Sequence, residues 1–502
     1  RMIIDSSLVL KDLREECDVC VIGSGAGGAV VAKELSCAGL RVILLEEGSH
    51  FKPEDFYQET WRGLSQLYVD YGLRSMFGKS YLPTMHARCL GGTTVVNSGI
   101  SFRLPEKVLN EWKRDFGVNH DYAKLSESFD RTGKITNIAE TEPDVYGNHN
   151  VLFKKGCEAL GLKAAPIKRN MRNCNGCGFC MMGCPNYAHL SMELSYIPIA
   201  VENGCRVYTD CRAEFVVERK GRAAGVRGRF LDKKTKKPTF DIEIKAKAVV
   251  VSCGAIGSPF LLLKSGIANK NKMVGKCFLN HPGAAVKGVF EERVEMWKGA
   301  PQGFECDDFL DEGFLIETAA LPAELAAMRV PGEGAEFKRR FSLFANAATW
   351  GVMVRAKTEG RVYYAAGKPW LFYPLKMEDL RKLQRGLKII ADIFFAAGAK
   401  MVMPGLRKVP PELHDPKETY LIENEEINQK DLYAIGNHPM GGCRMGEDPS
   451  KSVVSSSCES HEVKDLYVCD ASVFPTALGV NPQWSIMAFA DHAAQGMKEK
   501  YL

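Results

Sequence analysis

The chain has 502 residues, of which 45% are hydrophobic and 25% are charged. A single hydrophobic core stops growing at roughly 250 to 300 residues, so two or more packed units are expected. The formal net charge of +5 is small, and the densest basic stretch, residues 233–238, is expected to be a solvated hairpin loop. No apolar run approaches the roughly 20 residues that span a bilayer. Composition therefore argues against a nucleic-acid partner and against a transmembrane segment.

The sequence contains 17 cysteines, which lie scattered along the chain except for a dense run at residues 174–184. A chain of this length needs no disulfide bonds to fold, so a reduced, cytoplasmic setting is expected. The first residues lack the pattern of a signal peptide. Removal of a signal upstream, with periplasmic export alongside a partner protein, stays an open alternative.

The first ordered elements are expected to form a β-α-β unit. Residues 17–23 read as a buried, β-branched strand that ends in glycine. A helix is expected from about residue 25 to residue 38, followed by a second strand over residues 41–46. This unit of about 30 residues is the opening of a nucleotide-binding fold.

The middle of the chain changes character several times. Residues 51–86 are aromatic and irregular, which fits a lid or an excursion between core strands. Residues 105–165 are expected to be mostly helical. A small sheet is expected from three alternating or β-branched runs at residues 206–217, 223–231 and 240–252.

The last part of the chain is expected to return to the nucleotide fold, through a strand at residues 466–470 and a helix at about 482–498. The expected fold class is α/β, with a Rossmann-like cofactor domain and an α+β substrate domain that contains an antiparallel sheet. The cofactor domain comprises residues 10–100, 165–275 and 430–502, with the cysteine-rich loop at 170–190. The substrate or cap domain comprises residues 101–164 and 276–429.

A glycine-rich turn follows the first predicted strand and has the pattern G-x-G-x-x-G, with its glycines at Gly23, Gly25 and Gly28. Such glycines allow a tight turn, a close approach of the backbone to a pyrophosphate, and close packing of helix on strand. Glu46 ends the next predicted strand, where its carboxylate can accept a hydrogen bond from a ribose hydroxyl. The context predicts a dinucleotide site, and Glu46 argues against a 2'-phosphate.

Four further segments identify the family that the sequence resembles. The run Leu90-Gly-Gly-Thr-Thr-Val-Val-Asn97-Ser-Gly99 and the run that starts Gly254-Ala-Ile-Gly-Ser-Pro259 resemble flavin-contacting signatures of glucose-methanol-choline (GMC) oxidoreductases. Asn437-His438-Pro439 and the segment from Asp470 through Asn481-Pro482 resemble the closing elements of that family. All of them occur in the family's order, and the resemblance implies FAD as the cofactor.

The resemblance also implies which residues contact FAD. It places Gly91, Gly92 and Asn97 beside the flavin and Asp470 at the ribityl or pyrophosphate end, although Asp470 can also be read as a cap at a strand end. His281-Pro282 resembles another family element, but a structural histidine is the favoured interpretation. The full expected cofactor set is Gly23, Gly25, Gly28, Glu46, Gly91, Gly92, Thr93, Asn97, Ala213, Asp470, Ala471 and Pro482.

His438 is the predicted catalytic base. Oxidation of an alcohol requires removal of the hydroxyl proton as hydride leaves the carbon, and an imidazole with a pKa near 6.5 can accept that proton near neutrality. By resemblance, Asn481 is its partner and orients the substrate oxygen. The alternative is that a histidine before a proline simply caps a turn.

The cysteine run has the spacing C-x2-C-x2-C-x3-C-P, which is that of bacterial ferredoxins. It predicts an iron-sulfur cluster, a four-iron cluster more than a three-iron one, on Cys174, Cys177, Cys180 and Cys184. Cys184 can close the cluster, or the fourth ligand is remote or vacant, with Cys205 and Cys211 as the nearby alternatives. A zinc site and unligated cysteines are the other interpretations.

The leading functional hypothesis is an FAD-dependent dehydrogenase that oxidises an alcohol, polyol or sterol to a carbonyl compound. Electrons would leave through the cluster to an external acceptor, such as a redox protein or a quinone, with an accessory electron-transfer subunit as a further expected partner. The alternatives are an alcohol oxidase that uses oxygen and has inert cysteines, a lyase in which FAD is structural, and an electron-transfer subunit without an alcohol site.

Overall fold

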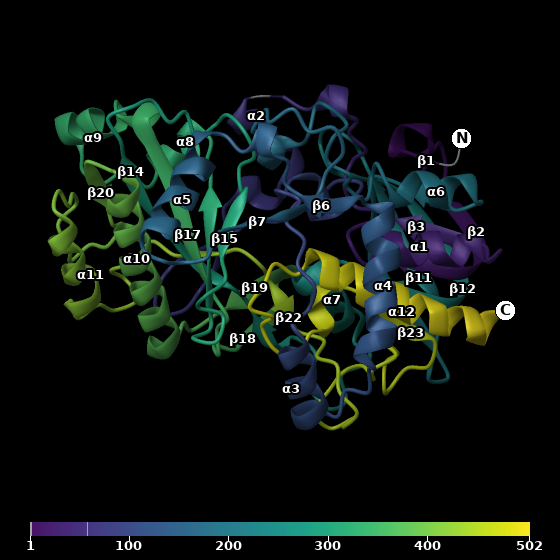
Figure 1. The fold of residues 1–502 in the computed structure, drawn as a ribbon. Coiled ribbons are helices and arrows are strands. Elements are labelled where there is room, and N and C mark those ends of the chain that lie inside the picture. The colour runs from purple at the N-terminus through teal and green to yellow at the C-terminus, as the bar shows by residue number, and fades with distance from the viewer. Residues whose placement is uncertain (1–2, 58) are drawn as a thin grey trace.

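The computed structural model describes residues 3–57 and 59–502. An eight-stranded sheet forms one end of the molecule, and both β1 and the end of the last helix, α12, lie there (Figure 1). Its strand order is β1-β9-β3-β2-β12-β11-β10, with β23 paired to β12. The bounds are β1 (Ile3–Ile4), β2 (Leu13–Ile22), β3 (Val42–Leu45), β9 (Arg206–Tyr208), β10 (Cys211–Arg219), β11 (Arg222–Leu231), β12 (Pro238–Val251) and β23 (Leu466–Val468).

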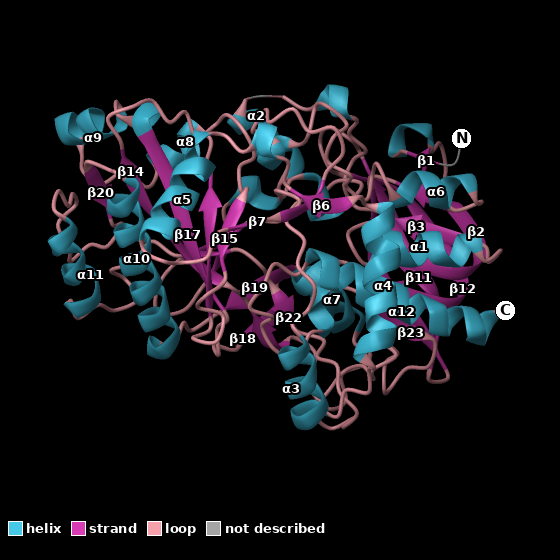
Figure 2. Cartoon of the chain, in the orientation of Figure 1, coloured by secondary structure: helices cyan, strands magenta, loops and turns pink. Residues whose placement is uncertain are grey.

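Helices cover this sheet and carry most of the remaining surface at this end (Figure 2). Helix α1 packs against both α6 and α12, and α12 also packs against α4. The helices of this part are α1 (Gly28–Cys37), α4 (Tyr122–Ile135), α6 (Tyr196–Glu202), α7 (Gly254–Ser265) and α12 (Gln483–Tyr501). Helices α2 (Thr60–Leu67) and α3 (Glu106–Phe116) lie outside it, and α5 (Asn148–Ala159) packs against α10 (Met377–Ala397) at the other end.

The second large sheet has nine strands in the order β4-β5-β21-β14-β17-β16-β15-β7, with β20 paired to β14. Its bounds are β4 (Arg74–Met76), β5 (Leu82–Thr84), β7 (Ala165–Pro166), β14 (Pro282–Val289), β15 (Phe304–Cys306), β16 (Phe314–Ala319), β17 (Ala347–Val354), β20 (Met401–Met403) and β21 (Ile435–Gly436). Helix α10 (Met377–Ala397) packs against β14 and β17. The other helices at this end are α8 (Ala323–Ala327), α9 (Gly334–Phe341) and α11 (Tyr420–Asn424).

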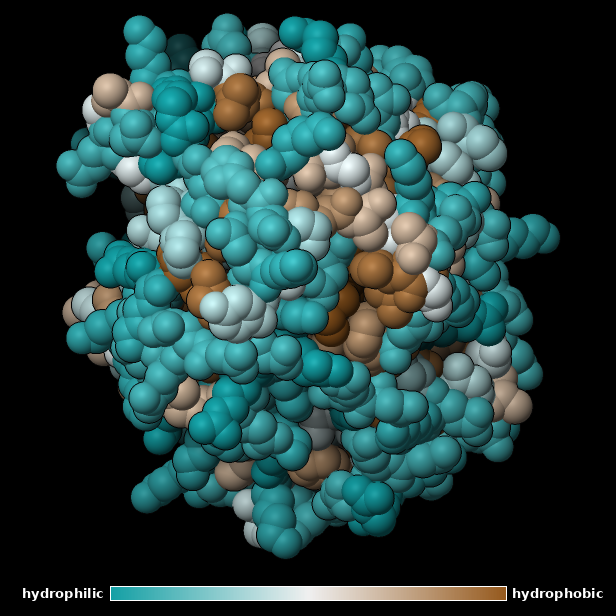
Figure 3. Space-filling model, turned by 60° about the vertical axis from the view of Figure 1, so that its left-hand side comes forward, coloured by the Kyte–Doolittle hydropathy of each residue, from teal (hydrophilic) through white to brown (hydrophobic). Residues whose placement is uncertain are grey.

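Two smaller sheets complete the fold. A four-stranded sheet has the order β19-β18-β13-β22, and β6 pairs with β8. Their bounds are β6 (Ile138–Glu140), β8 (Lys168–Asn170), β13 (Lys276–Leu279), β18 (Gly360–Ala365), β19 (Lys368–Phe372) and β22 (Met440–Gly441). Among the described residues, no helix is both long and apolar enough to cross a membrane. In the space-filling view, a mostly hydrophilic surface is interrupted near its centre by a group of hydrophobic side chains (Figure 3).

The expected fold class is confirmed: an α/β fold with an antiparallel second sheet. The opening β-α-β unit, the helices of residues 105–165 and the hairpin loop between β11 and β12 are present as expected. The three runs of residues 206–252 form strands as expected, but these strands belong to the eight-stranded sheet and not to a small sheet. Strand β12 is 14 residues long, so its first half pairs with β11 while its second half lies between β2 and β23. This length fuses the three runs with the nucleotide-type sheet.

Candidate active site

The glycine-rich turn between β2 and α1 is built as the sequence predicts. Gly23 has a φ of +97°, a conformation that favours glycine. A Cβ on Gly28 would lie 1.9 Å from the carbonyl oxygen of Gly23, and one on Gly27 would lie 1.8 Å from that of Cys469. A Cβ on Gly25 would meet nothing within 4 Å. Gly27 and Gly28 therefore allow close packing, whereas Gly25 leaves open space where a ligand can approach.

A second glycine pair faces this turn. Gly91 and Gly92 both have positive φ angles, and a Cβ on Gly92 would lie 3.0 Å from the Cα atom of Gly25. The backbone N–H of Gly91 donates to Oγ of Ser24 at 2.9 Å. Ser24 in turn donates to the Glu46 carboxylate at 2.6 Å, and burial raises the pKa of Glu46 above its ordinary value. Two glycine surfaces and a carboxylate at a strand end thus fit a bound dinucleotide.

The other predicted cofactor residues occupy the same region but have structural contacts of their own. Asp470 accepts from the N–H groups of Gly254 and Ser472, each at 2.8 Å, so the cap interpretation describes its observed contacts. Asn97 contacts Gln483 and accepts from the N–H of Gly99. The roles of these residues toward FAD stay predictions, as do those of the remaining members: Thr93, which accepts from Ala87 N–H, Ala213 on β10, Ala471 in the turn after Asp470, and Pro482 at the start of α12.

His438 and Asn481 are brought together from segments 43 residues apart, with Nε2 of His438 3.5 Å from Nδ2 of Asn481. The backbone N–H of His438 donates to Oδ1 of Asn280 at 3.1 Å, which holds the residue in place. Burial lowers the pKa of His438 to about 4, so its imidazole is neutral at pH 7. Oδ1 of Asn481 is buried without a hydrogen-bond partner, so it is available to a ligand.

His281 contacts His438, the predicted base, a contact that the structural interpretation of His281 did not include. Its Nδ1 lies 3.1 Å from Nδ1 of His438, and its Nε2 accepts the backbone N–H of Gly479 at 3.0 Å. Because Nε2 is an acceptor, a neutral His281 carries its proton on Nδ1 and donates it to His438. A neutral His438 then carries its own proton on Nε2, the atom that faces Asn481.

One face of the nine-stranded sheet forms a wall beside this pair. Trp350 of β17 stacks on Phe394 of α10 at 3.6 Å, which assigns the even-numbered residues of β17 to the helix-covered face. Residues directly opposite in paired strands share a face. The other face therefore contains Gly283, Ala285 and Lys287 of β14, Thr349, Gly351 and Met353 of β17, Leu315, Glu317 and Ala319 of β16, and Glu305 of β15.

This wall touches the catalytic pair and is mostly small and apolar. Glu317 lies beside Asn481, whose side chain lowers the pKa of the carboxyl group, and a Cβ on Gly283 would lie 2.4 Å from the Asn437 side chain. A Cβ on Gly351 would meet only a backbone oxygen at 3.4 Å, so the space in front of Gly351 is open. Glu305 lies opposite Glu317, and burial raises the pKa of Glu317 to about 8 and that of Glu305 to about 9. Both carboxyl groups are therefore mainly protonated at pH 7.

The cysteine loop does not form a recognisable metal centre. Among the described residues, no group of three or more His, Cys, Asp or Glu side chains is arranged to hold a metal ion. Sγ of Cys180 accepts from Nη2 of the buried Arg169 at 3.5 Å, and burial raises the pKa of Cys180 to about 12. The predicted iron-sulfur cluster on Cys174, Cys177, Cys180 and Cys184 is not supported by the described residues.

Backbone packing accounts for the shape of this loop. A Cβ on Gly178 would lie 2.1 Å from the carbonyl oxygen of Trp297, and one on Gly183 would lie 2.5 Å from the ring of Phe56. The hydroxyl of Tyr68 donates to the carbonyl of Met181 at 2.7 Å. The glycine-rich turns therefore join the loop to two neighbouring segments of the chain.

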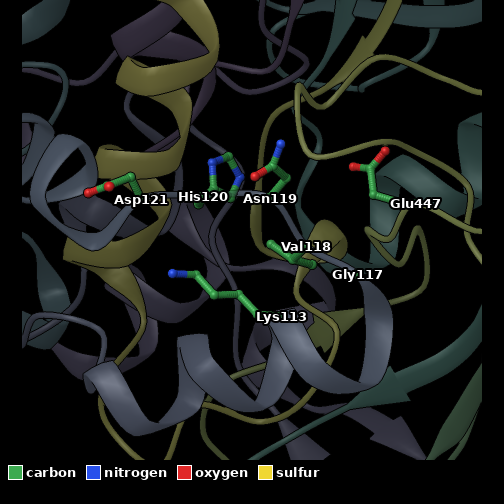
Figure 4. A pocket seen from close by; sticks show the side chains of 7 residues that line it. All are labelled: Lys113, Gly117, Val118, Asn119, His120, Asp121 and Glu447. Carbon is green, nitrogen blue, oxygen red and sulfur yellow. The ribbon is translucent and has the colours of Figure 1, made fainter.

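A surface hollow of about 540 Å³ lies elsewhere, beside the end of α3 and the start of α4. Figure 4 shows that its charged side chains do not converge on one point: Asp121 and Glu447 lie on opposite sides of His120. It is lined by Lys113, Gly117, Val118, Asn119, His120, Asp121 and Glu447. None of the predicted site residues lines it, so its size does not make it the active site.

Comparison with known proteins decides the family. Two models described as GMC oxidoreductase match residues 64–283 and 356–490. The chain belongs to the GMC oxidoreductase family. An uncharacterized GMC-type oxidoreductase of Mycobacterium tuberculosis is 34% identical over 479 residues, covering 94% of this chain and 74% of the relative. The long-chain-alcohol oxidase FAO1 of Arabidopsis thaliana is 30% identical, covering 95% of this chain and 66% of that protein.

Solved structures of GMC-type architecture share the fold. A formate oxidase from Aspergillus oryzae, in a structure concerned with FAD modification, matches with a TM-score of 0.72 at 14% identity, covering 98% of this chain and 99% of that one. Membership of the GMC family, the glycine surfaces and the flavoprotein neighbour together support FAD as the cofactor of this GMC oxidoreductase.

Proposed function

We propose that this GMC oxidoreductase oxidises the CH–OH group of an apolar alcohol to a carbonyl group. The observation that carries the proposal is the juxtaposition of His438 and Asn481, with 3.5 Å between Nε2 and Nδ2, in a chain of this family. When bound, FAD supplies the hydride acceptor. The residues that would hold it are the glycines of the two facing turns, together with Glu46 and Asp470.

The protein's own residues bind the alcohol oxygen and move its proton. The Nε2–H group of resting His438 donates to the alcohol oxygen, and the Asn481 amide fixes the direction of that oxygen. To accept the hydroxyl proton, the His281–His438 pair must pass to its other tautomer, in which Nε2 of His438 is free. In that tautomer Nε2 of His281 is protonated and no longer accepts from Gly479. The base role proposed for His438 therefore depends on His281.

The wall of the nine-stranded sheet supports an apolar substrate. Gly283 and Gly351 of this wall have no side chain, and Gly351 has open space in front of it. Protonated Glu317 and Glu305 add no negative charge to this wall at pH 7. The similar plant protein is named for long-chain alcohols, which agrees with this wall.

The acceptor of the electrons is proposed to reach the flavin directly, as oxygen or as an external carrier, because the cysteine loop offers no fitted relay. The test is an anaerobic purification with quantification of flavin and iron, followed by a panel of alcohols. Turnover is measured with oxygen, as hydrogen peroxide formed, and with an artificial acceptor. Absence of flavin, or absence of carbonyl product from every alcohol, would refute the proposed function. Stoichiometric iron would refute the direct route and restore the cluster.

A further inference from the structure

The segment between α2 and β5 exposes large hydrophobic side chains that the catalytic site does not use. Together with β19 it carries six residues that are 47–68% exposed, which we call the outer strip: Trp61, Tyr71, Leu73, Phe77, Tyr81 and Trp370. Single exposed hydrophobic residues are normal on soluble proteins, whereas contiguous ones mark interaction sites.

The members of the outer strip contact one another in three pairs. The rings of Trp61 and Tyr71 stack with centroids 5.5 Å apart, and the hydroxyl of Tyr81 contacts the carbonyl of Leu73 at 3.5 Å. The rings of Phe77 and Trp370 lie 5.8 Å apart, across a backbone bridge that joins Phe77 to β19.

The strip is not an uncovered part of the core. On α2 the buried residues are Thr60, Gly63, Leu64 and Leu67, so Trp61 faces away from the interior. Leu64 and Leu67 pack into a separate small cluster with Met182 of the cysteine loop. The segment is thus stabilised from its inner side, and its outer side is free to contact something else.

The backbone holds Tyr71 in the strip at a conformational cost. Asp70 and Tyr71 have φ angles of 50° and 57°, in the left-handed region that residues other than glycine rarely adopt. A local ion pair between Asp70 and Arg74 at 2.8 Å supports this turn. Strained residues of this kind persist where the surrounding structure holds them and cluster at functional sites.

Three basic side chains border the strip, beside the acidic side chain of Glu59, which is also exposed. Arg62, Lys79 and Lys368 are exposed, and none of them forms an ion pair within the described residues. Aromatic side chains of amphipathic character are enriched at membrane–water interfaces, and exposed lysine and arginine are attracted to anionic lipid headgroups. This combination fits a lipid surface better than it fits an apolar protein groove.

The inner side of the same hairpin contacts the residues that hold the catalytic histidine. Met76, which precedes Phe77, is fully buried, and its sulfur accepts from Nδ2 of Asn280 at 3.4 Å. Asn280 accepts from the backbone N–H of His438. In addition, Thr84 of β5 pairs with Gly436, two residues before His438. The hairpin therefore carries part of the outer strip on its exposed side, while its buried side contacts the segment that contains His438.

We propose that the outer strip docks this protein on an anionic phospholipid surface, with the hairpin of β4 and β5 turned toward the lipid. Docking there would deliver an alcohol dissolved in the bilayer close to His438; this delivery rests on the proposed function, whereas docking itself does not.

The test is binding of the flavin-loaded protein to vesicles of phosphatidylcholine with and without phosphatidylglycerol. Sedimentation with the anionic vesicles is expected, with a blue shift of tryptophan emission that is smaller in Trp61→Phe. The double variant Phe77→Ser with Trp370→Ser is expected to weaken binding by about tenfold or more, because two rings no longer enter the interface. Lys79→Glu with Lys368→Glu is expected to remove the preference for anionic vesicles.

Tyr420→Ser is the matched control, since Tyr420 is 55% exposed on α11 and outside the strip. It should bind vesicles as the parent does, and all variants should retain flavin and the parent circular dichroism. Failure of the parent to bind anionic vesicles at low salt would overturn the proposal, as would an equal loss in Tyr420→Ser. A dimer that shields Trp61 from a soluble quencher would assign the strip to a second copy instead. Vesicle binding without any alcohol turnover would refute the proposed function but leave docking intact.

Discussion

The predicted catalytic pair and the cysteine loop are both marked in the sequence by residue spacing and motif, but they differ in the structure: His438 and Asn481 lie within 3.5 Å of each other, whereas no metal centre is found among the described residues. His438 and Asn481 are held by contacts from distant elements, through Asn280, His281 and Glu317. The loop at residues 174–184 takes its shape from glycines packed against neighbouring backbone. Short spacing fixes only that side chains are near one another, whereas the geometry of a site is set by what packs around it.

Removing the imidazole of His438 tests the assembled site and should have the largest effect. His438→Ala is expected to lower kcat by about 10²- to 10⁴-fold, because no other group replaces the proton acceptor. Steady-state kinetics with an alcohol substrate measure this, and flavin content should not change. His414→Ala is the control, because the side chain of His414 is 62% exposed. A loss of less than about threefold in His438→Ala would contradict its base role.

His281 tests whether the pair acts as a unit. His281→Ala is expected to lower kcat by roughly tenfold, with KM little changed, because the tautomer of His438 that accepts the proton loses the Nδ1 atom of His281 to which its own Nδ1–H donates. The split between kcat and KM is the readout, since a merely misfolded variant would lose flavin as well. Unchanged kcat would show that His438 needs no partner.

Glu317, a member of the wall, is expected to make the stability of the folded protein depend on pH. The pKa of Glu317 is raised to about 8 in the folded protein, so the unfolded chain releases this proton at lower pH than the folded one. Stability must then fall as pH rises from about 4.5 to 8. Glu317→Gln removes the titrating group, so the difference between thermal midpoints at pH 5 and pH 8 should shrink by a few degrees. A difference equal to that of the parent would contradict the protonated state.

The cysteine loop should show the smallest effect. Cys174→Ser combined with Cys184→Ser is expected to change alcohol turnover by no more than about twofold, because no electron path through these thiols is proposed. Iron per flavin should be low in parent and variant alike. A large loss of turnover with an artificial acceptor, together with iron in the parent alone, would show that the cysteine loop holds a working cluster.

Local sequence patterns predict the parts of the fold that local chemistry determines. The first glycine turn needs a strand before it and a helix after it, and both can be read from β-branched runs and glycines. The fusion of β10, β11 and β12 with the main sheet could not be predicted, because the pairing of β12 with β2 joins residues more than 220 positions apart.

The same limit applies to the site. His438 and Asn481 are found by motif. The contact of His281 with His438 and the position of Glu317 beside Asn481 join segments that are far apart in the chain, and no local pattern predicts them. Gly27 is a partial exception. The glycine motif marks Gly27 as a place of close packing. The sequence does not show that the group packed against it is the carbonyl of Cys469, more than 400 residues later in the chain.

That approach has a consequence for how the protein matures. The carbonyl oxygen of Cys469 packs against Gly27 in the glycine-rich turn, and β23 pairs with β12 in the sheet. A ribosome releases the N-terminal turn long before it makes residue 469, and domains tend to fold as they emerge. This turn must therefore wait for the last stretch of polypeptide before it reaches its final packing. Flavin loading is consequently expected to be a post-translational event, and nascent chains stalled before residue 466 should not retain FAD.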